Sequence, residues 1–85
     1  MSTPTPIEVY WRPGCGFCMH LERSLSETDI PVTWHNIWDD PDAAAFVRSV
    51  ANGNEVVPTV TIDNQTFVNP DPRQLITMAT TPSQG

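Results

Sequence analysis

The sequence predicts a small α/β domain with the element order β-α-β-α-β-β-α, in which a small mixed sheet carries helices on both faces. Short runs rich in β-branched and aromatic residues alternate with longer amphipathic runs. The first two strands flank a helix, which favours a parallel pair joined by a right-handed crossover. The last two flank a two-residue turn, which favours an antiparallel hairpin.

The first half of the chain contains two predicted strands and one predicted helix. Residues 7–11 alternate as a strand, and the Pro13-Gly14 turn ends it. A helix then begins near Cys15. Its apolar positions recur three and four residues apart: Cys18, Leu21 and Leu25. We expect Pro31 to end this helix, because a residue before proline is pushed out of the α region. The second strand covers 32–37.

The next predicted helix has clear signals at both ends. Asp40 is a capping residue, and Pro41 stands at the first helical position. Residues 43–50 fill the helix, and Gly53 can adopt the left-handed conformation that stops it. The acidic residues Asp39, Asp40 and Asp42 are expected to form a solvated helix start and to need no binding partner.

The third strand is predicted to be interrupted. Segments 56–57 and 59–62 are apolar and β-branched on either side of Pro58. Residues 63–64 form a tight turn, and 66–68 return antiparallel.

A last short helix is predicted over 73–79, with Asn69 as its cap. Residues 1–6 and 80–85 are expected to be a flexible lead and a flexible tail. Between them, residues 7–79 form one domain, because a chain of 85 residues supports a single core.

Charge and composition limit the cellular compartments in which the protein is expected and the classes of partner that it can bind. The net charge is −6, and the only basic side chains are Arg12, Arg23, Arg48 and Arg73. Nucleic acid and anionic membrane surfaces would be repelled. The polar N-terminus has no signal-peptide core, and no run approaches the length that spans a membrane. We expect a cytoplasmic monomer.

The only two cysteines, Cys15 and Cys18, are three positions apart at the start of the first helix. Residues at i and i+3 share a helix face, which brings two cysteines within disulfide range. The helix N-terminus favours an anion, so Cys15 should ionise readily and be an exposed thiolate. Cys18 lies one turn in and should be the less reactive thiol. A C-x-x-C in a cytosolic βαβ context indicates redox chemistry.

Together these residues resemble the glutaredoxins of the thioredoxin superfamily, and so imply a thioredoxin-like (glutaredoxin) fold. The resemblance rests on C-G-F-C, on V-V-P-T-V about forty residues later, and on the element order from Ile7 to about Ala79. The C-G-[aromatic]-C, A-A-A-F-V-x-S-V, x-G-N-x-x-V-P-T-V and T-x-x-N-P patterns are more closely similar to the actinobacterial mycoredoxins. Those proteins reduce mixed disulfides with the sugar-linked thiol mycothiol.

The resemblance implies roles for individual residues. Cys15 matches the nucleophile and Cys18 the resolving cysteine. Val57-Pro58 matches a cis-proline pair whose backbone can bond to substrate as an added strand. The other expected substrate contacts are Arg12, Gly16, Phe17 and Asn69. Arg12 could favour the Cys15 thiolate or hold an anion.

Departures from the family pattern bear on the cosubstrate. Glutaredoxins that bind glutathione usually have a Gly-Gly pair after the hairpin, where this chain has Phe67-Val68-Asn69-Pro70. Met19-His20 stands where basic residues often follow the second cysteine. We therefore expect mycothiol rather than glutathione as cosubstrate, with no bound cofactor and no metal. The expected partners are this thiol and proteins that carry it as a mixed disulfide.

Other interpretations remain open. A zinc site could recruit His20 and His35, although a helical His20 should face solvent. An iron–sulfur carrier is conceivable because C-G-F-C differs at one position from the C-G-F-S of cluster-binding relatives, which usually also have an upstream lysine. A dithiol electron donor recharged by thioredoxin reductase is a further possibility. The cysteine pair of such proteins, however, typically encloses larger polar residues than Gly16-Phe17. Trp34 and Trp38 are expected to pack in the core or at its rim, while Trp11 could touch substrate.

Overall fold

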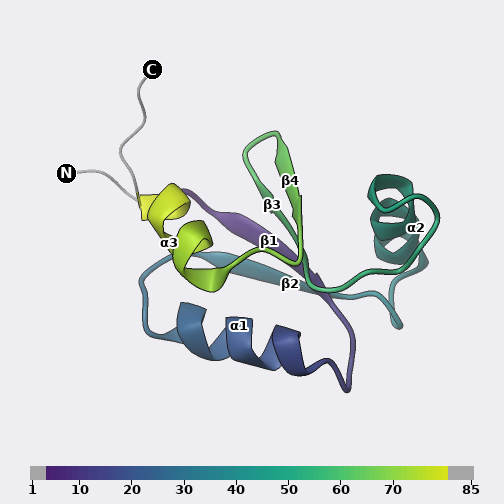
Figure 1. Cartoon of the computed structure of the whole chain (residues 1–85), viewed down its shortest axis with the longest axis horizontal. Coiled ribbons are helices and arrows are strands. Elements are labelled where there is room, and N and C mark those ends of the chain that lie inside the picture. The colour runs from purple at the N-terminus through teal and green to yellow at the C-terminus, as the bar shows by residue number, and fades with distance from the viewer. Residues whose placement is uncertain (1–3, 81–85) are drawn as a thin grey trace.

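The computed structural model describes residues 4–80 and has the predicted element order. The strands and helices, in chain order, are β1 (Ile7–Trp11), α1 (Gly16–Ser26), β2 (Val32–Asn36), α2 (Pro41–Val50), β3 (Thr59–Ile62), β4 (Gln65–Val68) and α3 (Pro72–Thr80) (Figure 1). The strands form one mixed sheet in the order β2-β1-β3-β4. Within residues 4–80, no helix has both the length and the apolar character needed to cross a membrane.

The sheet has the strand directions that the sequence predicts. β1 runs parallel to β2 and antiparallel to β3, so Val9 lies between Trp34 on one side and Val60 on the other. β3 and β4 form the predicted hairpin, in which Asp63 adopts a positive φ of 53°. Because β1 is an interior strand, its carboxyl end lies between neighbouring strands and not at an edge of the sheet. The loop that leads to Cys15 starts from this end.

Helices cover both faces, as predicted. The main core lies between the sheet and the helices α1 and α3, and its buried members are Ile7, Val9, Leu21, Leu25, Ile30, Val60, Ile62, Leu75 and Ala79. A smaller cluster on the other face consists of Ile37, which follows β2, and of Ala43, Ala44 and Val47 in α2, and Tyr10 of β1 packs against it. Figure 1 shows α1 below the strands and α2 standing apart at the right. Burial of these apolar side chains is the main stabilising term.

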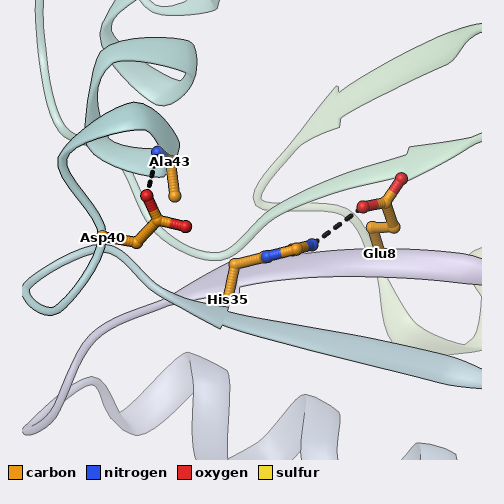
Figure 2. Close-up of polar contacts among 4 residues, drawn as sticks. All are labelled: Glu8, His35, Asp40 and Ala43. Atoms are coloured by element: carbon orange, nitrogen blue, oxygen red, sulfur yellow. Dashed lines mark hydrogen bonds and ion pairs between the residues drawn. The ribbon is translucent and has the colours of Figure 1, made fainter.

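The predicted start of α2 is confirmed. The Asp40 carboxylate accepts hydrogen bonds from the main-chain N–H groups of Asp42 at 3.0 Å and Ala43 at 3.2 Å (Figure 2). Pro41 occupies the first turn, as expected. Gly53 follows the helix with a φ of 88°, and its N–H donates to the Arg48 carbonyl at 2.8 Å.

The predicted end of α1 at Pro31 is wrong. The helix ends at Ser26, because Thr28 folds back on the last turn. Both the N–H and the hydroxyl of Thr28 donate to the Leu25 carbonyl, at 3.0 and 2.8 Å. The chain has therefore left the helix before the proline can act.

The predicted cap of α3 is also wrong. Asp71, and not Asn69, accepts a hydrogen bond from the Arg73 N–H at 3.0 Å, and the helix starts at Pro72. The helix runs one residue past its predicted end, and the Thr80 hydroxyl donates to the Ile76 carbonyl at 2.7 Å. The Thr5 N–H bonds to the Ala79 carbonyl at 2.8 Å. The rest of the expected lead and tail, residues 1–3 and 81–85, lies outside the described residues.

Three strand boundaries differ from the prediction, and one of them is that β4 starts at Gln65 instead of residue 66. Residues 56–57 are not a strand, because pairing with β1 begins only at Thr59, opposite Tyr10. β2 ends at Asn36, although the Ile37 N–H still donates to the Trp11 carbonyl at 2.9 Å. The differences in β2 and β3 lie at the end of the sheet where the cysteines are placed.

Candidate functional site

The two cysteines lie at the N-terminus of α1, both as free thiols. Cys15 is the N-cap residue, and its Sγ accepts a hydrogen bond from the Cys18 main-chain N–H at 3.1 Å. The expectation of an exposed Cys15 is wrong, since only 9% of the residue is exposed. Cys18 is deeper still, at 3%. The helix start therefore directs an N–H group at the more accessible of two covered sulfurs.

Cys18 is held in its protonated form. Burial, followed by the hydrogen bond between its side chain and that of Cys15, raises the pKa of Cys18 to about 12. The main-chain N–H and the positive charge of Arg12 act in the opposite direction without offsetting the burial. At neutral pH the Cys18 thiol is thus uncharged, and a neutral thiol is a poor nucleophile.

The segment before β3 covers Cys15 from the side. The Cys15 Sγ lies 3.8 Å from the carbonyl oxygen of Val57. The Val57-Pro58 peptide bond is cis, as the family resemblance implied. Within residues 4–80, the Val57 N–H has no hydrogen-bond partner. A main-chain donor and acceptor thus stand beside the Cys15 sulfur.

Thr59 fixes this segment, and the sequence analysis did not single it out. Its side chain is fully buried, and its hydroxyl donates to the Val56 carbonyl at 2.7 Å. The bond spans Val57 and Pro58. The available signal was a lone hydroxyl residue inside the apolar V-V-P-T-V run, since a buried hydroxyl requires a partner.

Asn69 contacts the same segment through its main chain. It adopts a left-handed conformation with a φ of 51°, and its N–H donates to the Pro58 carbonyl at 2.7 Å. Asparagine is one of the few residues besides glycine that adopt this conformation readily. The chain therefore turns at Asn69 although this stretch contains no glycine.

The remaining predicted contacts lie around the cysteines. Gly16 is exposed, and a Cβ added there would meet no atom within 4 Å. Phe17 points its ring to solvent with 68% of its surface exposed. Arg12 is exposed, and the structure brings it to Cys18. Together, α1, the β1–α1 loop and the Val57-Pro58 segment form the candidate site.

The histidines do not join this site. His20 is exposed on α1. His35 lies on β2, stacks on Tyr10 with ring centroids 4.7 Å apart, and bonds to the Glu8 carboxylate at 2.8 Å (Figure 2). In the part of the chain that the structure describes, no three His, Cys, Asp or Glu side chains are grouped closely enough to hold a metal ion. The residues present therefore do not fit a zinc site.

A hollow of about 280 Å³ lies beside Cys18, on the side of α1 that faces β2. Trp11 and Trp34 line it, together with Arg12, Met19 and Glu22. Trp34 and Trp38 were expected in the core or at its rim, yet they are 37% and 61% exposed. Trp34 lies on the edge strand β2, which has a neighbouring strand on one side only.

Comparison with known proteins assigns the family. The glutaredoxin family model matches residues 7–68. Two curated Mycobacterium tuberculosis proteins, from strains CDC 1551 and H37Rv and provisionally named glutaredoxins, are each 37% identical over 65 residues, which is 75% of this chain and 77% of the relative.

Solved structures share the fold. NrdH-redoxin from Escherichia coli, a glutaredoxin-like protein, superposes with a TM-score of 0.74 at 22% identity, over 91% of this chain and 99% of that one. The thioredoxin-like protein BC3987 gives 0.70 at 23% identity, over 81% and 93%. With its cysteine pair at a helix start, the chain belongs to the glutaredoxin family of the thioredoxin superfamily.

Proposed function

We propose that this glutaredoxin reduces mixed disulfides between proteins and mycothiol, with Cys15 as the nucleophile. The observation that carries the proposal is the 3.1 Å hydrogen bond from the Cys18 N–H to the Cys15 Sγ at the N-cap of α1. Negative charge forms on sulfur when a thiol attacks as a thiolate. An N–H donor and the positive end of the helix dipole both stabilise that charge.

The reaction is a pair of thiol–disulfide exchanges. The Cys15 thiolate attacks the mycothiol sulfur of the mixed disulfide, and the protein thiolate leaves and takes up a proton. Cys15 now carries mycothiol through a new disulfide bond. A second mycothiol, as its thiolate, attacks the sulfur of the bound one, releases mycothiol disulfide and restores the Cys15 thiolate. A separate reductase supplies the two electrons that return the disulfide to thiols.

Cys18 supports this one-cysteine route. For a dithiol route, Cys18 would have to attack Cys15 and release mycothiol. Because the pKa of Cys18 is raised to about 12, its thiolate is scarce at neutral pH. A free mycothiol in solution is then the more effective second nucleophile.

Main-chain groups of Val57 are proposed to align the substrate. The Val57 carbonyl lies 3.8 Å from the Cys15 Sγ, and its N–H is free of partners within residues 4–80. The cysteinyl part of a thiol bound to Cys15 carries amide groups that can pair with both, as an added strand would.

The charge of the chain favours mycothiol over glutathione. Glutathione carries carboxylates, and Arg12 is the one basic side chain among the proposed site residues. Its charge acts on Cys18. Mycothiol carries a sugar in place of those carboxylates and needs no cation. We propose that the protein acts in a reducing compartment such as the cytoplasm.

The test is turnover of one small mixed disulfide with mycothiol and with glutathione, each coupled to its own reductase. Turnover with mycothiol alone is expected. Equal or faster turnover with glutathione would contradict the choice of cosubstrate. Turnover with neither, together with reduction by thioredoxin reductase, would replace the proposal with a dithiol electron donor.

A further inference from the structure

Two hollows lie next to each other between helix α1 and strand β2. The first, of about 280 Å³, adjoins Cys18, and the second, of about 340 Å³, continues towards Leu25 and Val32. Glu22 and Trp34 line both. We call this feature the α1–β2 groove, defined by the lining residues Trp11, Met19, Glu22, Leu25, Val32 and Trp34.

The groove leaves large apolar side chains in contact with water. Trp34 is 37% exposed, and Met19 on its rim is 63% exposed. Clustered exposure of large apolar groups beside a depression is typical of a surface that a partner covers. Trp is also the residue that most often contributes a large share of the binding energy at protein interfaces.

The strand that borders the groove has a free edge. β2 is the last strand in the sheet order and pairs only with β1 among the described strands. Exposed edges are usually protected by charged residues or proline. None of the residues Val32–Asn36 is Lys, Arg, Asp, Glu or Pro. An extended segment can therefore add to this edge through main-chain hydrogen bonds.

The register places such a segment over the groove. Trp34 lies opposite Val9, a member of the core on the α1 side of the sheet. Side chains of an added strand alternate between the two faces, so every second one would enter the groove beside Trp34. Cys18 lines the first hollow, and its N–H bonds to the Cys15 sulfur, so a segment held there lies close to the cysteine pair.

Charge selects among the occupants. Glu22 is the carboxylate common to both hollows, Arg12 lines only the first, and the chain carries a net charge of −6. A basic side chain placed where the two hollows meet is attracted to Glu22, whereas a second copy of this chain brings a further net charge of −6.

We propose that the α1–β2 groove docks an extended segment of the target protein that carries the mixed disulfide. Every second side chain of the segment faces the groove. One apolar side chain enters each hollow, and a basic side chain between them lies on Glu22. This inference rests on the proposed function for the identity of the partner, and it concerns a surface separate from Cys15 and Val57.

The test uses two capped peptides, Leu-Thr-Arg-Thr-Leu and Leu-Thr-Glu-Thr-Leu, titrated into the reduced, isotopically labelled chain. The Arg peptide should shift the Trp34 indole N–H resonance and bind more tightly than the Glu peptide. Glu22→Arg should weaken binding of the Arg peptide by about fivefold or more and reverse the preference. Glu22 is exposed on α1, so this variant is expected to fold.

Glu27→Arg is the matched control. It makes the same change in net charge at an exposed position that lines neither hollow. It should leave the Kd of the Arg peptide within about twofold. Trp34→Ala should weaken both peptides, and both groove variants should keep wild-type turnover of a small mixed disulfide.

Specific results would overturn the docking proposal. One is that the wild type, and likewise Glu22→Arg, binds the Arg peptide and the Glu peptide equally tightly. Another is a set of shifts centred on Val57 instead of Trp34. A dimer that forms through Trp34 with increasing concentration would assign the groove to a second copy. If the proposed function is wrong, the wild type will not turn over the small mixed disulfide, whereas it will still bind the peptides.

Discussion

The Cys18 main-chain N–H donates a 3.1 Å hydrogen bond to the Sγ of Cys15. This bond belongs to the backbone of α1, so it does not depend on the Cys18 side chain. Cys18→Ser and Cys18→Ala should therefore keep mixed-disulfide turnover within about threefold of wild type, a barrier change of about 0.7 kcal/mol. Steady-state kinetics with mycothiol check this. A fall of about a hundredfold would show that Cys18 attacks in the cycle.

Stability should fall in alkali because of Cys18. Burial raises the pKa of Cys18 from its ordinary value of 9.0 to about 12, so between these values the folded state binds more protons than the unfolded chain. The contribution of the neutral Cys18 thiol to the free energy of unfolding is fully present below pH 9 and is lost as the pH rises towards 12. The loss is at most about 1.4 kcal/mol per pH unit.

Urea unfolding under reducing conditions, between about pH 8 and about pH 10.5, measures this loss. Cys18→Ala should show a shallower decline than wild type, and Cys15 is common to both proteins. Parallel stability curves for the two would contradict the raised pKa.

Thr59 should matter for both stability and substrate binding. Thr59→Val leaves the Val56 carbonyl without its 2.7 Å partner and should cost about 1–3 kcal/mol. Thr59→Ser keeps the hydroxyl and loses only a methyl group, about 0.8 kcal/mol. Urea unfolding compares the two, and KM should rise more in the Val variant because Val57 is less well held. A Val variant at least as stable as the Ser variant would exclude this role.

The backbone at Asn69 should tolerate glycine but not alanine. Asn69 has a φ of 51°, in the region that costs most L-residues about 1–2 kcal/mol. Asn69→Ala should lose about that amount of unfolding free energy, while Asn69→Gly should stay within about 0.5 kcal/mol of wild type. Thermal or urea unfolding decides between them. Equal stabilities for the Ala and Gly variants would show that the turn relaxes.

Sequence reasoning succeeded where the deciding contact is local. Asp40 caps residues two and three positions further on, and Gly53 ends the same helix, so both signals lie within a few residues. The relative directions of the paired strands followed from the length of the connections, since a helix joins β1 to β2 and a two-residue turn joins β3 to β4.

It failed where the deciding contact comes from another part of the chain. Asn69 and Asp71 each precede a proline, and either could cap α3. The bond from Asn69 to Pro58 commits Asn69 to the turn and leaves the cap to Asp71. Cys15 is covered by Val57, a residue 42 positions away. The exposure of Trp34 depends on β2 being an edge strand, which no local pattern reveals.

The central claim is that Cys15 alone carries mycothiol during turnover, and mass spectrometry of a trapped adduct tests it most directly. The reduced Cys18→Ser and Cys15→Ser variants are each incubated with mycothiol disulfide at neutral pH, and the intact proteins and their peptides are weighed. The account predicts one mycothiol on Cys18→Ser, released by free mycothiol, and none on Cys15→Ser. An adduct on Cys15→Ser, no adduct on Cys18→Ser, or an adduct that free mycothiol does not release would contradict it.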